Sequence, residues 1–249
     1  MQHIFLPPEQ FSDSIVRITG VDHQHLARVL RARVGEKIVV LDGTGNAFHA
    51  ELVSIEKHES TAQIEAPLVI SSESAIHLTI AQALGKGDKF EEVVQHGTEA
   101  GASAFLPLRA ERCVVDVPAA KERDRIARWQ QIAKSAAEQS KRALVPTVRQ
   151  LVTSSELIAQ ASDSASEAGI PLFMLHTSEA AITLKAALQT LTKPEFLILA
   201  IGPEGGWSPK EILLAQKANL PLVSLGPRVL RTETAALVAI SQIIYHFDV

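Results

Sequence analysis

Short apolar segments alternate with amphipathic ones from residue 76 onward, and this alternation limits the fold more than any other feature. The apolar segments have the length of strands and cover residues 76–84, 104–108, 171–176, 196–201 and 221–226. Between them apolar residues recur at helical spacing. The longest such stretch, residues 121–144, is stopped by Pro146 and would bury one face made of Ile126, Trp129, Ile132 and Ala136. Strands that alternate with helices predict an α/β domain with a mostly parallel sheet and helices on both faces.

The first seventy or so residues follow another pattern and predict a small β-rich unit. Apolar runs within residues 35–56 flank DGTGN (residues 42–46), a strong turn signal. Before them, HLARVLR (residues 25–31) predicts a short helix with Leu26, Val29 and Leu30 on one face. A proline- and serine-bearing stretch makes Ser72 a plausible boundary, so we expect domains at 1–72 and 73–249. The low-complexity residues 160–169 predict a loop or a helix end.

The composition indicates an ordinary globular chain. With 249 residues, 46% of them hydrophobic and 21% charged, the chain can bury a full core. No apolar run reaches the length of a membrane span, and the first residues lack a secretory signal, so we expect no membrane association. Cys113 is the only cysteine, which excludes a disulfide framework and a cysteine metal cluster and fits a cytoplasmic protein.

Positive charge gathers in two segments although the formal net charge is −4. Residues 121–149 contain eight basic and three acidic residues, and residues 17–37 contain five basic and two acidic residues. Basic segments on an acidic protein are typical of local contact with a phosphate backbone. They are equally compatible with two solvated helix faces.

The loop GPEGG (residues 202–206) lies between a strand pattern and a helix start. Ser208 occupies an N-cap position, Pro209 the first helical position, and Glu211 lies three residues after the serine, which together predict a capping box. The glycines permit positive φ or close approach of a ligand to the backbone. Glu204 would repel a pyrophosphate but suits a cationic ligand, and neither GPEGG nor GKGDK (residues 85–89) has the spacing of a phosphate loop.

A second loop, GPRVLRTETAAL (residues 226–237), repeats the order strand, Gly-Pro, loop, helix. Its threonines can cap the helix, and Glu233 suits a helix N-terminus, so a capped helix start with two exposed arginines is one interpretation. The other is a ligand site, since two such loops at the carboxyl ends of strands are where α/β sheets bind ligands. The chain has no GxSxG, HExxH or CxxC motif, and 4% aromatic residues argue against a base-stacking platform.

The two loops together resemble the SPOUT methyltransferase superfamily, and within it the 16S rRNA (uracil-N3)-methyltransferase family. The resemblance rests on IGPEGGWS followed by LGPRVLRTETAAL, and it extends to HLARVLR, DGTGN, AQALGKGDKFEEVVQHGTEAGASAFLPL and EQSKRALVP, so it covers nearly the whole chain. It implies a PUA-like RNA-binding β-barrel, a SPOUT-type parallel sheet with a C-terminal trefoil knot, and a homodimer that completes the active site across its interface. It also implies 16S rRNA within the small ribosomal subunit as the substrate.

The resemblance further implies S-adenosylmethionine as the cofactor. The positions that match its binding residues are Leu175, Leu199, Ile201, Gly202, Gly206, Leu225, Gly226, Val229, Leu230, Arg231, Thr234 and Ala235. For catalysis we expect Arg231 to stabilise the uracil N3 anion or the uracil carbonyls. Glu233 and Glu204 are the candidates for accepting the proton, although each carboxylate could equally serve as a helix cap or a loop brace. The expected RNA contacts are Arg17, Arg28, Arg31, Lys86, Lys141 and Arg142.

One departure and two alternatives remain at this point. Family members often carry a basic residue near the N-terminus, where this chain has only His3. A ribose 2′-O-methyltransferase of the same superfamily, acting on rRNA or tRNA, is one alternative. The other is a non-catalytic RNA-binding factor in ribosome assembly. The sequence leaves open which uridine is modified, which group accepts the proton, and whether free rRNA suffices.

Overall fold

The computed structural model describes residues 1–163, 170–178 and 181–248, and the chain divides into two compact units. The first unit takes residues 1–73 and 137–145, and the second takes residues 74–136 and 146–249. The first segment of this unit ends at residue 73, next to the boundary expected at Ser72. Residues 137–145 also belong to this unit, and no feature of the sequence predicted that. Most of the low-complexity segment, residues 164–169, lies outside the described residues.

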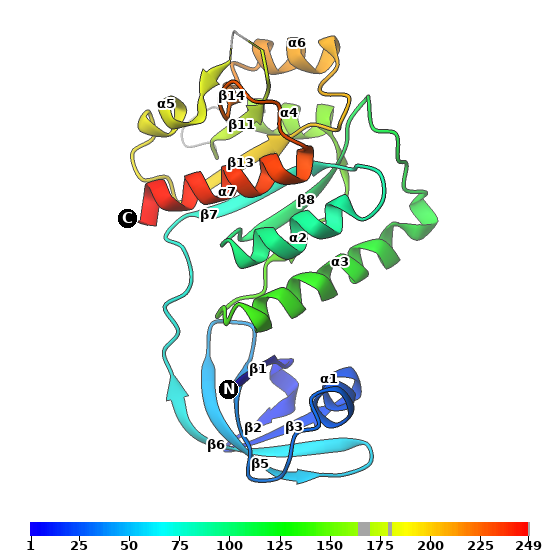
Figure 1. Cartoon of the computed structure of the whole chain (residues 1–249), viewed down its shortest axis with the longest axis vertical. Helices are drawn as coiled ribbons and strands as arrows, with labels where there is room; N and C mark the ends of the chain where they lie inside the picture. Colours follow the sequence, from blue (N-terminus) through cyan, green and yellow to red (C-terminus); the bar gives the residue numbers. More distant parts are fainter. Residues whose placement is uncertain (164–169, 179–180, 249) are drawn as a thin grey trace. The chain divides into compact units, whose positions relative to one another are not determined.

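A six-stranded sheet forms the first unit, as the turn signals predict (Figure 1). Its strands are β1 (Gln2–Phe5), β2 (Phe11–Ser12), β3 (Ile15–Thr19), β4 (Lys37–Leu41), β5 (Ala47–Ile55) and β6 (Glu59–Leu68), with a 3-10 turn, η1, at Pro8–Gln10. The strand order is β1-β4-β5-β6-β3-β2, antiparallel except between β1 and β4. The predicted turn at residues 42–46 is confirmed: the Asp42 carboxylate accepts hydrogen bonds from the backbone N–H groups of Thr44, at 2.8 Å, and Asn46, at 3.2 Å.

The short helix expected over residues 25–31 differs from the prediction in its geometry. Helix α1 (Gly20–Gln24) continues into a π-helical turn, η2 (His25–Val29), closed by a hydrogen bond from the Leu30 N–H to the His25 carbonyl. The wider turn rotates the side chains away from the 3.6-residue spacing. Leu26 is therefore buried, as predicted, but Val29 and Leu30 are exposed, and their predicted place in the core is wrong.

The second unit is built on an eight-stranded sheet in which every pair is parallel. Its strands are β7 (His77–Ala83), β8 (Ala104–Arg109), β9 (Thr147–Val148), β10 (Val152–Thr153), β11 (Leu172–Leu175), β12 (Ile182–Thr183), β13 (Phe196–Ile201) and β14 (Leu222–Ser224). They run in the order β10-β8-β7-β13-β11-β14-β12, with β9 beside β8. All five strands predicted in this part of the chain are present.

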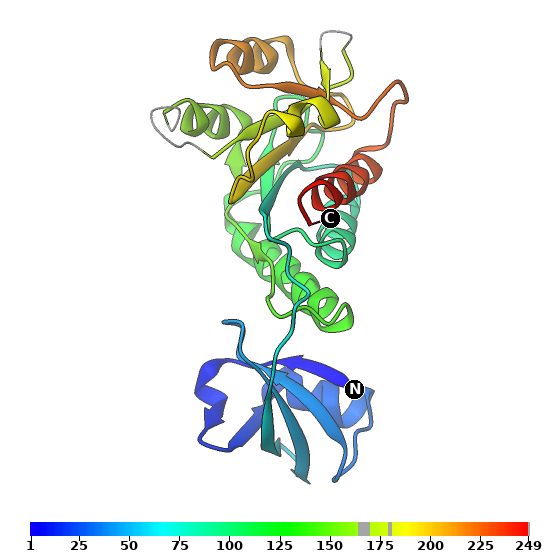
Figure 2. The same cartoon turned by 90° about the vertical axis from the view of Figure 1, so that its left-hand side faces the viewer.

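Helices cover both faces of this sheet, as the alternating pattern predicts (Figure 2). Helices α2 (Lys89–Glu99) and α7 (Thr232–Asp248) pack on one face, where the missing Cβ of Gly97 makes room for Phe105. Leu106 points to the opposite face and joins the core under α4 (Ser154–Asp163) and α6 (Pro209–Lys217). Helix α5 (Leu184–Gln189) follows β12. None of the described helices is long and apolar enough to span a membrane.

Helix α3 (Ala119–Gln139) is shorter than predicted. Trp129 packs against Phe90 of α2, with ring centroids 4.4 Å apart, and Ala136 is buried as expected, whereas Ile126 and Ile132 are only half-buried. The helix ends before Pro146 because Lys141 adopts φ +58° and the Arg142 N–H turns back to the Ala137 carbonyl. Such a left-handed residue is a common helix stop, although glycine usually occupies it.

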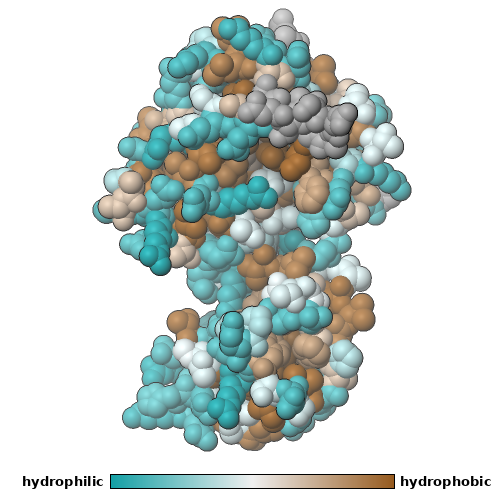
Figure 3. Space-filling model, turned by 180° about the vertical axis from the view of Figure 1, so that it is seen from behind, coloured by the Kyte–Doolittle hydropathy of each residue, from teal (hydrophilic) through white to brown (hydrophobic). Residues whose placement is uncertain are grey.

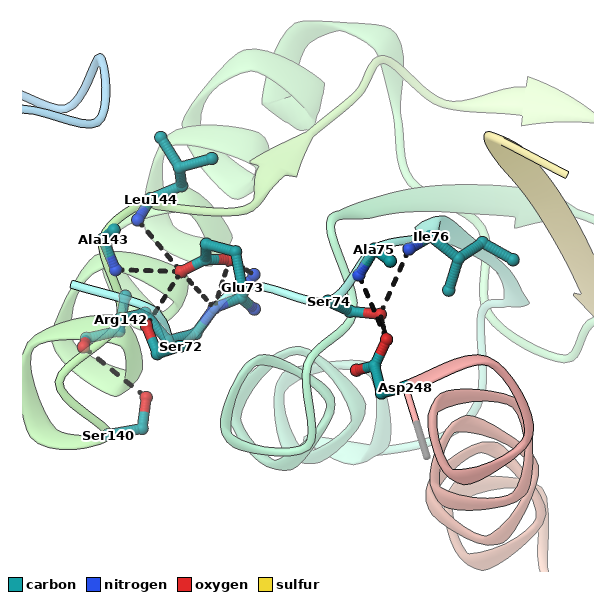
Figure 4. Close-up of polar contacts among 11 residues, drawn as sticks. Ser72, Glu73, Ser74, Ala75, Ile76, Ser140, Arg142, Ala143, Leu144 and Asp248 are labelled. Atoms are coloured by element: carbon teal, nitrogen blue, oxygen red, sulfur yellow. Dashed lines mark hydrogen bonds and ion pairs between the residues drawn. The ribbon is translucent and has the colours of Figure 1, made fainter. Parts of the chain in front are cut away.

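Glu73 and Ser74 are held by separate polar contacts within their own units (Figure 4). The Glu73 carboxylate accepts hydrogen bonds from the Arg142 guanidinium and from the backbone N–H groups of Ala143 and Leu144. Asp248, near the end of α7, accepts hydrogen bonds from the Ser74 hydroxyl and the Ala75 N–H. Apolar and polar surface residues are intermixed on the face of the molecule drawn in Figure 3.

The contacts of Glu73 predict an acid-sensitive contribution to stability. Burial would raise the pKa of Glu73, but Arg142 and the two backbone donors outweigh burial and lower that pKa. A lowered pKa stabilises the fold above the unfolded value, and this stabilisation is lost as the pH falls through the folded value. Between about pH 6 and about pH 3 the wild type should therefore lose unfolding free energy faster than Glu73→Gln in urea denaturation.

The matched control is Glu9→Gln, which changes an exposed carboxylate of the same unit. Glu9→Gln should follow the wild-type dependence on pH. If Glu73→Gln also follows it, the Glu73 carboxylate contributes nothing to stability and this part of the account fails.

Candidate active site

The two Gly-Pro loops meet at one edge of the second unit's sheet. The parallel register places Ile201 of β13 level with Leu175 of β11, and Leu175 level with Val223 of β14. The segments that follow these strands therefore converge, and they enclose a pocket of about 530 Å³. Lys89, at the start of α2, completes the wall. This volume lies within the range of small-molecule sites.

Most of the residues expected to bind a cofactor line this pocket. The pocket wall includes Leu175, Ile201, Gly202, Gly206, Leu225, Gly226, Val229, Leu230, Arg231 and Ala235. Leu199 does not line it, because it lies further from the edge and is fully buried within the sheet. Thr234 does not line it either, because in the first turn of α7 it points to solvent while Ala235 points inward.

The first loop has the predicted helix start. Ser208 Oγ accepts a hydrogen bond from the Glu211 N–H, at 3.2 Å, and the Glu211 carboxylate accepts one from the Ser208 N–H, at 2.7 Å, so the capping box is confirmed. Gly206 adopts φ +67°. At Gly202 an added Cβ would lie 3.1 Å from the Trp207 ring, so the glycine lets the indole pack against the backbone.

Two side chains that the sequence analysis missed connect the strand ends. Trp207 donates its indole N–H to the Leu175 carbonyl, at 2.9 Å. Thr232 Oγ1 accepts a hydrogen bond from Gln82 Nε2, at 2.8 Å, and donates one to the Gly202 carbonyl, at 2.9 Å. The second connection joins β7, the first loop and the start of α7. Only the Thr-Glu-Thr sequence at the helix start indicated a polar role for Thr232, and it suggested no more than a cap.

An ammonium between two carboxylates forms the charged side of the site. Lys89 Nζ lies 2.9 Å from Glu204 Oε1 and 3.6 Å from Glu233 Oε2. Glu204 lines the pocket, but Glu233 does not, and Glu233 Oε2 is buried without a hydrogen-bond partner in the described residues. Glu233 thus reaches the pocket lining through its contact with Lys89, and its expected role as proton acceptor stays a prediction.

Other pocket residues set the local charge. Arg228 and Arg231 are exposed, and neither side chain forms a hydrogen bond or ion pair with the described residues. Burial lowers the pKa of His176, which favours the neutral ring at neutral pH. In the described part of the chain, no group of three His, Cys, Asp or Glu residues is arranged to hold a metal ion.

The expected RNA contacts fall into two groups. Arg17, Arg28, Arg31 and Lys141 of the first unit and Lys86 of the second unit are exposed, as a phosphate contact requires. Arg142 is 4% exposed, and its guanidinium is bound to Glu73. Its predicted contact with RNA is therefore wrong: Arg142 holds its own unit together, a pairing with no signal in the sequence.

The hydrogen bonds of Thr232 predict a test of the site's framework. Thr232→Val keeps the shape of the side chain but removes the hydroxyl that accepts from the buried Gln82 amide and donates to the Gly202 carbonyl, so Gln82 keeps only its bond to the Ala83 carbonyl. We expect a loss of about 1–3 kcal/mol of unfolding free energy, measured by denaturant titration. Thr232→Ser keeps the hydroxyl and should lose less than half as much. Equal stability of the valine variant and the wild type would show that this connection carries no energy.

Comparison with known proteins agrees with this architecture. A family model described as an RNA methyltransferase domain matches residues 72–244, and one described as an RNA methyltransferase PUA domain matches residues 18–65. The chain is 35% identical to the ribosomal RNA small subunit methyltransferase E of Synechocystis, over 96% of this chain and 76% of that protein. It is 34% identical to the protein of the same name from Bacillus subtilis, over 93% of this chain and 90% of that protein.

Solved structures agree as well. A ribosomal RNA small subunit methyltransferase E from Neisseria gonorrhoeae, bound to S-adenosylmethionine, superposes with a TM-score of 0.85 at 34% identity, covering 99% of this chain and 98% of that one. A methyltransferase from Legionella pneumophila with bound S-adenosylmethionine gives a TM-score of 0.87 at 31% identity, covering 98% and 97%.

The predicted parallel α/β sheet and the PUA-like N-terminal part are thus confirmed, while the trefoil knot stays a prediction. The resemblance first seen in the two Gly-Pro loops extends over nearly the whole chain. The chain belongs to the RNA methyltransferase family.

Proposed function

We propose that this protein is an S-adenosylmethionine-dependent methyltransferase that acts on N3 of a uridine in 16S rRNA of the small ribosomal subunit. The observation that carries the proposal is the pocket between the two Gly-Pro loops, because it occurs in a chain about one third identical to the Neisseria and Bacillus proteins over nearly its whole length. We propose that residues 1–72 form the RNA-binding domain and residues 73–249 the catalytic domain, except that residues 137–145 pack with the first unit.

The pocket has the chemistry that this cofactor needs. Bare backbone at Gly206 and Gly226 leaves room for a flat ring, and the apolar side chains of Leu175, Leu225 and Leu230 would cover it. The Glu204 carboxylate offers a counter-charge for a sulfonium or an ammonium group. When bound, S-adenosylmethionine supplies a methyl group on a positively charged sulfur.

Arg231 is the residue we propose for the developing charge on the base. Arg231 lines the pocket, and its guanidinium forms no ion pair within the described residues, so it is available to a substrate. N3 lies on the pairing edge of uracil, so the base must be unpaired or turned out of its helix to reach the pocket. A guanidinium beside O2 or O4 would stabilise the N3 anion that the transfer requires.

The first unit is the proposed RNA contact. Four basic side chains of this unit are exposed: Arg17 in β3, Arg28 in the π-helical turn η2, Arg31 after that turn, and Lys141. Arg31 has φ +52°, a conformation that non-glycine residues rarely adopt and that often marks functional surfaces. Lys86 would contact RNA near the pocket. Binding through these residues should weaken steeply with salt, and insensitivity to salt would exclude this role.

We also propose a cytoplasmic homodimer. Val229, Leu237 and Tyr245 remain exposed on the second loop and on α7, although they are large apolar or aromatic side chains. A partner that covers them would complete the pocket from outside. Light scattering should give the mass of two chains, and the mass of a single chain would contradict this part of the proposal.

The reaction is tested with pure protein, S-adenosylmethionine carrying a deuterated methyl group, and unmodified small ribosomal subunits. Nucleoside mass spectrometry should find the label in N3-methyluridine. Label on a ribose oxygen would identify a 2′-O-methyltransferase instead. Subunit binding without any label would support a non-catalytic assembly factor. A parallel reaction with free 16S rRNA establishes which form of the RNA is the substrate.

Arg231→Ala gives a specific prediction for this reaction. We expect the rate of transfer to fall by about a hundredfold or more, because a donor to the developing anion is lost. The unfolding free energy should stay within about 0.5 kcal/mol of wild type, since the side chain is exposed. Arg231→Lys keeps the charge but loses the planar guanidinium, so its transfer rate should lie between those of Arg231→Ala and the wild type. Wild-type turnover by Arg231→Ala would remove this residue from the mechanism.

A further inference from the structure

Lys89 holds Glu204 in a defined orientation at the pocket wall. Glu204 Oε1 accepts hydrogen bonds from Lys89 Nζ, at 2.9 Å, and from the Lys86 N–H, at 3.3 Å. The loop between β7 and α2 is shaped around this oxygen: an added Cβ on Gly85 would lie 2.9 Å from it. One carboxylate oxygen is therefore fixed by a loop that is distant in sequence.

The second oxygen of Glu204 has no partner of this kind. Lys86 and Lys89 both bind Oε1, and no other described residue donates a hydrogen bond to Oε2; the Glu204 side chain, which lines the pocket, is 32% exposed. A pocket-lining carboxylate with one oxygen anchored and no neighbouring residue bound to the other has the geometry of a general base. Glu233 lacks this geometry, because it does not line the pocket and its Oε2 is buried.

The charge around Glu204 keeps it ionised. Burial would raise the pKa of Glu204, but the hydrogen bond from Lys89 and the backbone donors outweigh burial and lower that pKa. On its other side Lys89 faces Glu233 at 3.6 Å, and the two carboxylates raise the pKa of Lys89, with the Glu204 hydrogen bond as the largest cause. Because one ammonium faces two carboxylates, Lys89 stays charged and the cluster retains a negative charge toward the pocket.

We infer that Glu204 Oε2 is the acceptor of the N3 proton and that Lys89, supported by Glu233, is the residue that positions it. This inference rests on the proposed N3 methylation. The N3–H bond breaks toward Glu204, the electron pair left on N3 forms the N–CH3 bond, and the pair of the breaking C–S bond stays on sulfur, which becomes an uncharged thioether. Glu204 then returns its proton to solvent through the open side of the pocket.

The first test compares Glu204→Gln, Glu233→Gln and wild type in single-turnover transfer to small subunits at saturating cofactor. At saturating S-adenosylmethionine, Glu204→Gln should slow transfer by about a hundredfold or more. Calorimetry should show that this variant still binds the cofactor, with a lower affinity because the counter-charge is lost. Glu233→Gln should slow transfer less than tenfold. The inference is wrong if Glu204→Gln turns over normally, or if Glu233→Gln is the more damaging change.

The second test separates positioning from simple structural support. Without the ammonium, Glu204 is protonated at higher pH, so Lys89→Met should be slow near pH 5 and recover toward pH 7, with the acid limb displaced upward by about one pH unit. Lys89→Arg keeps the charge and should restore the flat wild-type profile. Lys185→Met changes an exposed lysine of α5 and is the matched control. An equal loss at every pH would reduce Lys89 to a structural role and overturn its part of the inference.

A third readout does not depend on the RNA target. Carbon-13 NMR of glutamate carboxylates in the cofactor-bound protein, assigned with Glu204→Gln, should show Glu204 titrating about one pH unit or more higher in Lys89→Met than in wild type. If the wild type methylates no uridine but this displacement is present, the N3 assignment fails and the positioning role of Lys89 stands. If the displacement is absent, the positioning role fails whatever the substrate is.

Discussion

The parallel pairing of β13 with β7 on one side and β11 on the other is the constraint on which the rest of the structure depends. It places Gln82, Ile201 and Leu175 level at one edge of the sheet. From that edge Gln82 reaches Thr232, Thr232 reaches Gly202, and Trp207 reaches Leu175. Four chain segments that are far apart in sequence are thereby joined into the walls of one pocket. A slip of one residue in either pairing would turn these side chains to the other face of the sheet.

The carboxylates around this edge are used in two ways. Glu211 is 2% exposed and is surrounded by donors from Ser208, Ser154 and Glu111, so it fixes the entry to α6 and cannot meet a ligand. Glu204, three residues after the end of β13, lines the pocket, and only its Oε1 is held by Lys86 and Lys89. The buried carboxylate of Glu211, with its hydrogen bonds formed, stabilises the fold, whereas the less fully bonded carboxylate of Glu204 is available for catalysis.

Sequence patterns predicted those parts of the molecule that depend on neighbouring residues. The capping box at Ser208, the turn at Asp42 and the strand segments needed only local spacing, and the two Gly-Pro loops carried enough pattern to locate the pocket. The role of Lys89 was not predicted, because its partner Glu204 lies 115 residues away in the sequence. Arg142 was misjudged for the same reason, since nothing near it in sequence shows that Glu73 neutralises it. The exposure of Val29 follows from a π-helical turn that ordinary helical spacing does not anticipate.

The most direct measurement is a crystal structure of the protein with S-adenosylmethionine. The account predicts the cofactor between residues 202–206 and 225–231, with its methyl group exposed to the side of the pocket that holds Arg231 and Glu204. Cofactor bound elsewhere on the chain, or bound here with the methyl group directed away from both side chains, would contradict it.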